Sequence, residues 1–179
     1  LREISGYYAL VRDFLVLSED EWMEALAEGC RNIGRNLNDT RGLMHSFRDS
    51  RETMQMLFDD LKALDCSDWE ICFELRIKRA RHIRIYADVL VITEDKVFSL
   101  EFKMKDTIDP EEMKQAVKYS KYLDVIFGSE YEVIPALVLT KMNDFYSWEP
   151  LPDSGMEIPV CSGDMLFNVF DEFLEFLER

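Results

Sequence analysis

A change in hydrophobic spacing near Ser67 constrains the fold more than any other feature of this chain. From Arg41 to Leu64, before the change, apolar residues recur at helical spacing. After it, they alternate or run together in short segments, which is typical of strands. These segments are Trp69 to Ile77, Arg84 to Ile92 and Val97 to Met104. The pattern predicts helices first and a sheet afterwards.

A further helix and strand complete the predicted core. Asp109-Pro110 opens the helix, because Asp caps a helix start and Pro fits its first position, and Gly128 ends it. A continuous apolar strand follows from Val133 to Thr140, which indicates burial on both faces. We therefore expect an α/β (α+β) fold in which helices flank a central mixed sheet with a β-β-β-α-β core.

The ends of the chain carry weaker signals. Tyr7 to Leu17 is predicted as a short helix, and Ser18 with Glu21 fits a capping box that starts another. Ile158 to Cys161 suggests a short last strand, and Leu166 to Leu177 an amphipathic helix. We expect one domain over 1–179, with a helical amino-terminal part (1–65), an α/β core (66–161) and a carboxy-terminal helix (162–179).

Composition limits the class of protein. Hydrophobic residues make up 47% of the chain, enough to form a core, and no apolar run approaches the roughly 20 residues that cross a membrane. The four cysteines are scattered and none forms a CxxC pair. We read them as reduced core thiols of a cytoplasmic protein with no membrane association.

Charge is distributed unevenly. The net charge of -15 argues against nucleic-acid binding, because phosphate contacts need local positive charge. Residues 74–84, however, carry five Arg or Lys against one Glu. We expect a basic connection at Lys78 to His82, so the overall charge weakens a nucleic-acid hypothesis without excluding it.

Two carboxylates and a lysine form the candidate chemical centre. Side chains alternate along a strand, so Glu101 and Lys103 share one face, while Phe98, Leu100 and Phe102 share the other. A hairpin turn centred on Glu94-Asp95 places Asp88 directly opposite Glu101. Two facing carboxylates repel each other, and a bound cation removes that repulsion.

This arrangement suits phosphodiester hydrolysis. Mg²⁺ or Mn²⁺ favours one or two carboxylates together with waters and phosphate oxygens, and Asp88 and Glu101 offer such a set. Lys103 would place an ammonium beside the metal, where it could orient a water or offset charge on the phosphate. Exposed strand ends also carry such residues without any function, so the motif alone is a weak signal.

Other residues near the centre have candidate supporting roles. Gln115 on the following helix could orient a ligand or water, with Tyr119 one turn later. Glu74 is either an extra metal ligand or an ion-pair partner of Arg76 or Arg84. Lys114, Lys118 and Lys121 form a basic stripe that either meets a nucleic-acid backbone or is a solvated helix face. The predicted nucleic-acid contacts are Arg76, Lys78, Arg79, Arg81, Arg84, Lys105 and Lys118.

The strands and motif together resemble the PD-(D/E)xK nuclease superfamily. The similarity covers about residues 7–141 and includes Asp88, Glu101-Phe-Lys103, Gln115 to Tyr119 and Pro135 to Thr140. It implies a restriction-endonuclease-like fold, metal binding by Asp88 and Glu101, a catalytic Lys103 and a supporting Gln115. The superfamily often adds an acid on an early helix, for which Glu52 is the candidate. Tyr86-Ala87 before Asp88 departs from the Arg-Ile of many relatives.

The resemblance carries expectations about function and partners. It implies an Mg²⁺- or Mn²⁺-dependent nuclease acting on DNA rather than RNA, in repair, restriction or defence. More narrowly, the sequence is similar to bacterial modules that precede a superfamily 1 helicase. A chain that begins at Leu1 fits a segment of such a protein. A homodimer is expected where both strands are cut. The alternative is a degenerate module of the same fold that binds a partner or positions substrate for an attached helicase.

Overall fold

The computed structural model describes residues 1–37 and 40–174. Within these residues the first half contains η1 (Arg2–Ile4), β1 (Ser5–Leu10), α1 (Val11–Val16), α2 (Glu19–Asn32), α3 (Thr40–Asp60), β2 (Glu70–Ala80) and β3 (Ile83–Ile92). The second half contains β4 (Lys96–Lys103), α4 (Pro110–Phe127), β5 (Glu132–Leu139), β6 (Tyr146–Pro150), β7 (Glu157–Ser162), η2 (Gly163–Met165) and α5 (Phe167–Phe173).

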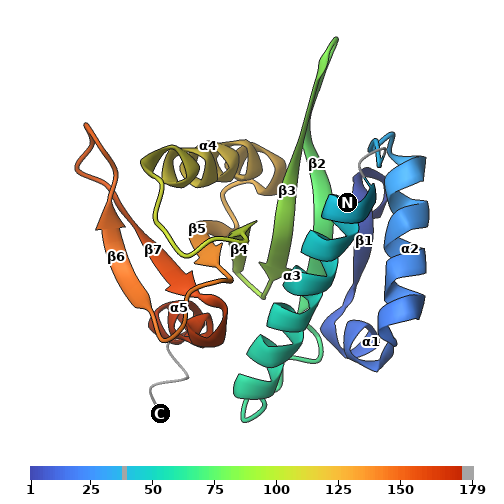
Figure 1. Cartoon of the computed structure of the whole chain (residues 1–179), viewed down its shortest axis with the longest axis horizontal. Coiled ribbons are helices and arrows are strands. Elements are labelled where there is room, and N and C mark those ends of the chain that lie inside the picture. Colours follow the sequence, from blue (N-terminus) through green and yellow to red (C-terminus); the bar gives the residue numbers. More distant parts are fainter. Residues whose placement is uncertain (38–39, 175–179) are drawn as a thin grey trace.

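One mixed sheet organises the described part of the chain. Its seven strands lie in the order β1-β2-β3-β4-β5-β7-β6 (Figure 1). Neighbours pair antiparallel except for β4 with β5 and β5 with β7, which are parallel. The helix α4 connects the parallel strands β4 and β5, as a parallel crossover requires. The predicted β-β-β-α-β core in an α+β fold is therefore confirmed.

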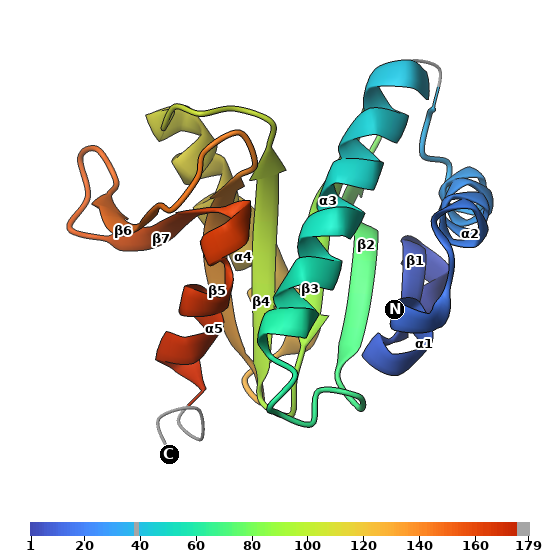
Figure 2. The same cartoon turned by 60° about the horizontal axis from the view of Figure 1, so that its bottom comes forward.

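Each face of the sheet has its own hydrophobic core. On one face, α1, α2, α3 and α5 contribute to a cluster that includes Phe14, Trp22, Phe73, Phe98 and Phe170. On the other face, α4 packs through Met113, Ala116, Val117 and Leu123. In Figure 2, α3 and α5 cross in front of the sheet. The central strands are thus buried on both sides, which explains the continuous apolar run of β5.

The predicted alternation along β4 and the hairpin turn are confirmed. Phe98 and Leu100 face the α3 and α5 side, whereas Val97 faces the α4 side. The register pairs Val89 with Leu100 and Ile92 with Val97, so the turn falls at Glu94-Asp95 as predicted. The capping predictions hold as well. The amide of Glu21 donates to Ser18 Oγ (3.1 Å), the amide of Ser18 to Glu21 Oε1 (2.9 Å) and the amide of Glu111 to Asp109 Oδ1 (2.9 Å).

Two predictions about elements were wrong in part, and one strand was missed. The segment Tyr7–Leu10 is not helical but forms the end of β1, because its backbone pairs with the free edge of β2. The predicted connection at Lys78–His82 shrinks to the turn at Arg81 and His82, because β2 runs to Ala80 and β3 starts at Ile83. The strand β6 was not predicted at all. The helix α5 ends at Phe173, and residues 175–177 of the predicted helix lie outside the described residues.

The remaining whole-chain features concern the cysteines and the helices. All four cysteines are buried and unpaired, as predicted. Burial raises the pKa of the Cys66 thiol to about 11, so this group stays protonated near neutral pH. Within the described residues, no helix combines the length and the apolar character needed to cross a membrane.

We expect Gly29→Ala to destabilise the fold by about 1–3 kcal/mol or more, because β1 and α2 touch backbone to backbone at this position. A Cβ on Gly29 would lie 1.8 Å from the carbonyl oxygen of Gly6, so the helix would have to move. Gly155→Ala is the matched control, since a Cβ there meets nothing within 4 Å. Equal melting temperatures for the two variants would contradict this prediction.

Candidate metal and phosphodiester site

The site lies where the sheet divides into two branches. The pairing of β3 with β4 ends at Val89 and Leu100, whereas the pairing of β3 with β2 continues to Ile83 and Ala80. In place of the next ladder bond, the Asp88 carboxylate accepts a hydrogen bond from Phe102 N at 2.8 Å. Asp88 therefore marks the point where the β2–β3 hairpin separates from β4.

Asp88 and Glu101 come together as predicted. The register of the hairpin brings them opposite each other, and their carboxyl groups lie within hydrogen-bonding reach. Burial raises the pKa of both groups, and the negative charge of Asp88 raises the pKa of Glu101 further. Glu101 is 2% exposed, and its Oε1 is buried with no hydrogen-bond partner in the described structure. A shared proton or a bound cation would relieve the repulsion between the two groups.

Glu74 brings a third carboxyl group to the same place. It interrupts the ladder opposite Asp88, and its φ of 54° lies in the left-handed region that non-glycine residues rarely adopt. Burial, followed by the charge of Asp88, raises the pKa of Glu74 to about 8, although Arg35 opposes the shift. Backbone strain of this kind clusters at functional sites, so the position supports a role for Glu74.

The ion-pair partner predicted for Glu74 was wrong. Arg35 Nε, from the segment after α2, lies 3.0 Å from Glu74 Oε1. Arg76 instead donates to Ile33 O at 2.8 Å, and Arg84 donates to Ala80 O at 2.7 Å. The Arg35 guanidinium also lies over the Tyr86 ring, 4.7 Å from its centroid. These two contacts hold Arg35 beside the carboxyl groups. No local motif in the sequence predicts this position.

A cavity opens on the α3 side of these residues. It has a volume of about 290 Å³, and its walls include Arg35, Glu74, Asp88 and Lys103 together with residues of α3. The positive charge of Lys103 lies close enough to lower the pKa of both Asp88 and Glu101. Within the described residues Lys103 forms no salt bridge of 4.0 Å or less. The ammonium is therefore available to a ligand in the cavity.

The helix α4 approaches the carboxyl pair from the opposite face. Gln115 Nε2 donates to Tyr119 Oη at 2.8 Å. Burial, followed by the charge of Glu101, raises the pKa of Tyr119. No hydrogen bond joins Gln115 to Asp88 or Glu101 within the described residues. Gln115 therefore bonds to Tyr119 rather than to either carboxyl group, and the charge of Glu101 acts on the pKa of Tyr119.

The acidic residue of the early helix that faces the site is not Glu52. Glu52 is exposed and lines a neighbouring cavity of about 200 Å³ with Asp164. Asp49, one helical turn earlier, lines both that cavity and the site cavity. Sequence reasoning missed Asp49, because residues three apart on one helix share a face and only packing decides which of them reaches inward.

The predicted basic residues do not form one surface. Lys105 is engaged with Glu112 at 2.8 Å, and Lys118 is exposed on α4. Lys78 reaches α4, where its Nζ lies 3.3 Å from Tyr122 Oη. Arg79, Arg81 and Arg84 are exposed at the tip of the β2–β3 hairpin. Within the described residues Arg79, Arg81 and Lys118 are thus exposed without a salt bridge or side-chain hydrogen bond, whereas the other four cations are engaged within the fold.

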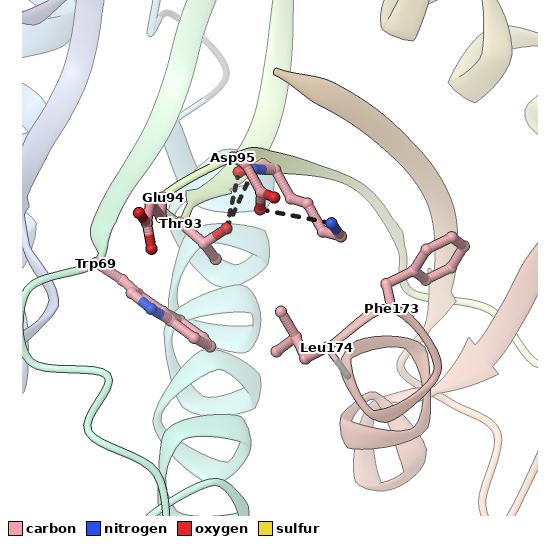
Figure 3. A pocket seen from close by; sticks show the side chains of 7 residues that line it. Trp69, Thr93, Glu94, Asp95, Phe173 and Leu174 are labelled. Atoms are coloured by element: carbon pink, nitrogen blue, oxygen red, sulfur yellow. Dashed lines mark hydrogen bonds and ion pairs between the residues drawn. The ribbon is translucent and has the colours of Figure 1, made fainter. Parts of the chain in front are cut away.

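A second cavity lies at the other end of β4. Its volume is about 360 Å³, and Figure 3 shows Trp69, Thr93, Glu94 and Asp95 on one side and Phe173 and Leu174 on the other. Lys96 lies 3.4 Å from Asp95 and 3.6 Å from Glu132, so charges at this turn compensate each other. The carboxyl groups that line this cavity, Glu94 and Asp95, are exposed, whereas Glu101 at the first site is buried.

The donor set at the first site fits a divalent cation. Asp88 and Glu101 supply two adjacent carboxyl groups, and the orphaned Glu101 Oε1 is an oxygen that lacks a protein partner. Mg²⁺ commonly binds one or two carboxylates and completes its shell with waters and phosphate oxygens. No cluster of three or more His, Cys, Asp or Glu side chains suited to a metal occurs within the described residues. The site would therefore depend on water or substrate for the remaining ligands.

Comparisons with known proteins give no family. No family model matches the chain, and no curated protein matches it significantly. Among solved structures, the chain is similar to protein VC1899 from Vibrio cholerae at 15% identity and a TM-score of 0.37. The match covers 90% of this chain but 37% of that protein. A likeness at this level carries no argument about function, which leaves the geometry of the site as the basis for one.

Proposed function

We propose that this chain is an Mg²⁺- or Mn²⁺-dependent nuclease of the PD-(D/E)xK type that hydrolyses phosphodiester bonds of DNA. The observation that carries the proposal is the Asp88–Glu101 pair, in which Glu101 is buried and the half-buried Asp88 lines an open cavity beside Lys103. Two adjacent carboxyl groups that are largely withdrawn from water are unfavourable unless a proton or cation is shared between them. A divalent cation would offset both charges and still leave room for a phosphate.

The residues divide into distinct roles. Asp88 and Glu101 would hold the metal, and the Phe102 amide fixes the orientation of the Asp88 carboxylate. The metal would supply Lewis-acid polarisation of a phosphate oxygen and a lowered pKa for water. Lys103 carries its ammonium on the cavity wall, where it would orient the attacking water and offset charge that develops on the phosphate.

Arg35 and Glu74 would act around this centre. Arg35 keeps its guanidinium on the cavity wall through the ion pair with Glu74 and the contact with Tyr86. A guanidinium presents several N–H donors in one plane, and only one of them is used by Glu74. The free donors would contact a phosphate oxygen. Glu74 would then serve mainly to position Arg35.

The test is cleavage of labelled single- and double-stranded DNA in Mg²⁺ or Mn²⁺ by the wild type, Asp88→Asn and Asp95→Asn. Asp95 is the matched control, because it belongs to the same hairpin but lies at the exposed turn. We expect cleavage by the wild type and Asp95→Asn, and loss of cleavage in Asp88→Asn.

Two results would contradict the proposal. Equal cleavage by Asp88→Asn would place the activity elsewhere or in a contaminant. Absence of cleavage in all three proteins, with no metal bound in a calorimetric titration, would favour a module that binds a partner without catalysis. The net charge of -15 is the feature that such a module would use.

A further inference from the structure

The β2–β3 hairpin carries a strongly basic extension that we call the basic arm, residues 78–84. Beyond the point where β3 leaves β4 and β2 leaves β1, β2 and β3 pair only with each other, from Arg76 and Tyr86 to Ala80 and Ile83. In Figure 1 this two-stranded ribbon projects well beyond the rest of the sheet. The arm therefore presents both of its faces and its tip to the surroundings.

The charge on the arm is uncompensated within the fold. Arg79 and Arg84 are direct cross-strand partners, and like charges in that position destabilise a hairpin. No Asp or Glu occurs between residues 75 and 87. Arg79, Arg81 and Arg84 form no salt bridge of 4.0 Å or less within the described residues. In a chain of net charge -15, such a concentration of cations indicates an anionic ligand.

The base of the arm is anchored on both sides. Arg76 Nη1 donates to Ile33 O at 2.8 Å, which ties β2 to the end of α2. Lys78 Nζ lies 3.3 Å from Tyr122 Oη and 5.5 Å from the centroid of that ring, which ties β2 to α4. At the tip, by contrast, Ile83 is 49% exposed beside the arginines. The contacts hold the base in place and leave the tip free for a ligand.

We propose that the basic arm enters the major groove of B-form DNA and that Arg79, Arg81 and Arg84 contact its phosphates. The choice of a nucleic acid as the anion rests on the proposed function. The major groove of B-DNA is wide enough for a two-stranded β-ribbon, whereas the major groove of an A-form RNA duplex is too narrow.

The composition of the arm favours a duplex over a single strand. Proteins that bind single strands stack bases on aromatic side chains. Within residues 78–84 the only aromatic-type ring is His82, and Tyr86 below the arm is already covered by Arg35. Cations on both strands of a narrow ribbon instead match the two phosphate backbones that border a groove.

The arm and the candidate site also belong to one strand. Arg84 and Asp88 are four residues apart on β3, which corresponds to about 13 Å along a strand. A duplex held by the arm would therefore pass close to the Asp88–Glu101 pair. The arm would supply binding energy and register, and the carboxyl pair would supply the chemistry.

Binding in EDTA tests this inference separately from cleavage. Fluorescence anisotropy would compare a short labelled DNA duplex, the matched RNA duplex and the single DNA strand, at about 50 and about 200 mM salt. The arm variant combines Arg79→Gln, Arg81→Gln and Arg84→Gln. The control combines Arg12→Gln, Arg31→Gln and Lys62→Gln, which removes the same charge from exposed positions elsewhere. Circular dichroism would check that both variants fold.

We expect the wild type and the control to prefer the DNA duplex. The arm variant should lose at least about tenfold in affinity, and its slope of log affinity against log salt should fall by about 2 to 3. Equal binding by the arm variant and the control, or preference for the single strand or RNA, would overturn the inference. If DNA binding depends on the arm but the protein does not cleave DNA, the proposed function alone is overturned. If the protein cleaves DNA but binds it equally well without the arm cations, the inference about the arm alone is overturned.

Discussion

We expect Lys103→Ala to lower the rate of DNA cleavage by about 10²- to 10⁴-fold while metal affinity changes little. Lys103 lines the cavity beside Asp88, and no salt bridge within the described residues engages its ammonium. Loss of the ammonium would remove a group that acts on water and phosphate in the transition state. The two carboxyl groups that would hold the metal would remain. The variant should therefore show a reduced kcat with a similar KM.

Lys105→Ala is the matched control for this experiment. Lys105 lies two residues further along the chain, is exposed, and pairs with Glu112 at 2.8 Å. Its loss should leave the cleavage rate within a few fold, because an exposed ion pair contributes little. Single-turnover cleavage and calorimetric metal titration would be measured on the same preparations. Similar rates for Lys103→Ala and Lys105→Ala would remove Lys103 from the mechanism.

The core of the fold follows from local signals that the structure then confirms. The turn at Glu94-Asp95 sets the register of β3 and β4, so the meeting of Asp88 with Glu101 could be predicted from spacing alone. The caps at Ser18 and Asp109 are equally local, because each bond joins residues two or three apart. Such features depend on a few neighbouring residues, and sequence reasoning is strongest there.

The errors concern features that distant residues decide. Tyr7–Leu10 joins the sheet because the edge of β2 is free to pair with it. The sequence of the segment itself does not show that such an edge exists. The same holds for β6, a short edge strand whose position depends on β7. The charged ends of β2 and β3 looked like a connection, yet each strand supports the other well beyond the sheet.

The candidate site shows the same division. Its carboxyl pair and lysine lie on one hairpin and could be predicted, whereas Arg35 reaches it from the end of α2 and Asp49 from α3. The left-handed conformation of Glu74 could not be predicted either, because Glu has no preference for it. These residues enter only through tertiary packing, so they are the ones that a motif search overlooks.

We expect Glu101→Gln to change the pH dependence of stability in the metal-free protein. The folded-state pKa of Glu101 is raised above its ordinary value of 4.5, mainly by burial and then by Asp88. The folded protein therefore holds this proton more tightly than the unfolded chain. The tighter binding of this proton stabilises the folded state, and this contribution is fully present below about pH 4.5. As the pH rises towards the folded-state pKa, the contribution is lost at about 1.4 kcal/mol per pH unit.

A glutamine at position 101 removes this loss. Its amide can donate a hydrogen bond to the Asp88 carboxylate at every pH, whereas Glu101 can do so only while it is protonated, below its raised pKa. In EDTA, thermal unfolding at about pH 5 and about pH 8 should show the variant gaining stability over the wild type as the pH rises. Glu94→Gln, at the exposed turn, should follow the wild type.

The same variant separates a metal site from a merely buried acid pair. Added Mg²⁺ or Mn²⁺ should raise the melting temperature of the wild type and of Glu94→Gln by mass action, and should leave Glu101→Gln unchanged. If Glu101→Gln is more stable than the wild type in EDTA and does not respond to metal, the carboxyl pair of the wild type lowers the stability of the metal-free protein. Parallel pH curves for the wild type and Glu101→Gln, or an unchanged response to metal, would contradict this account of Glu101.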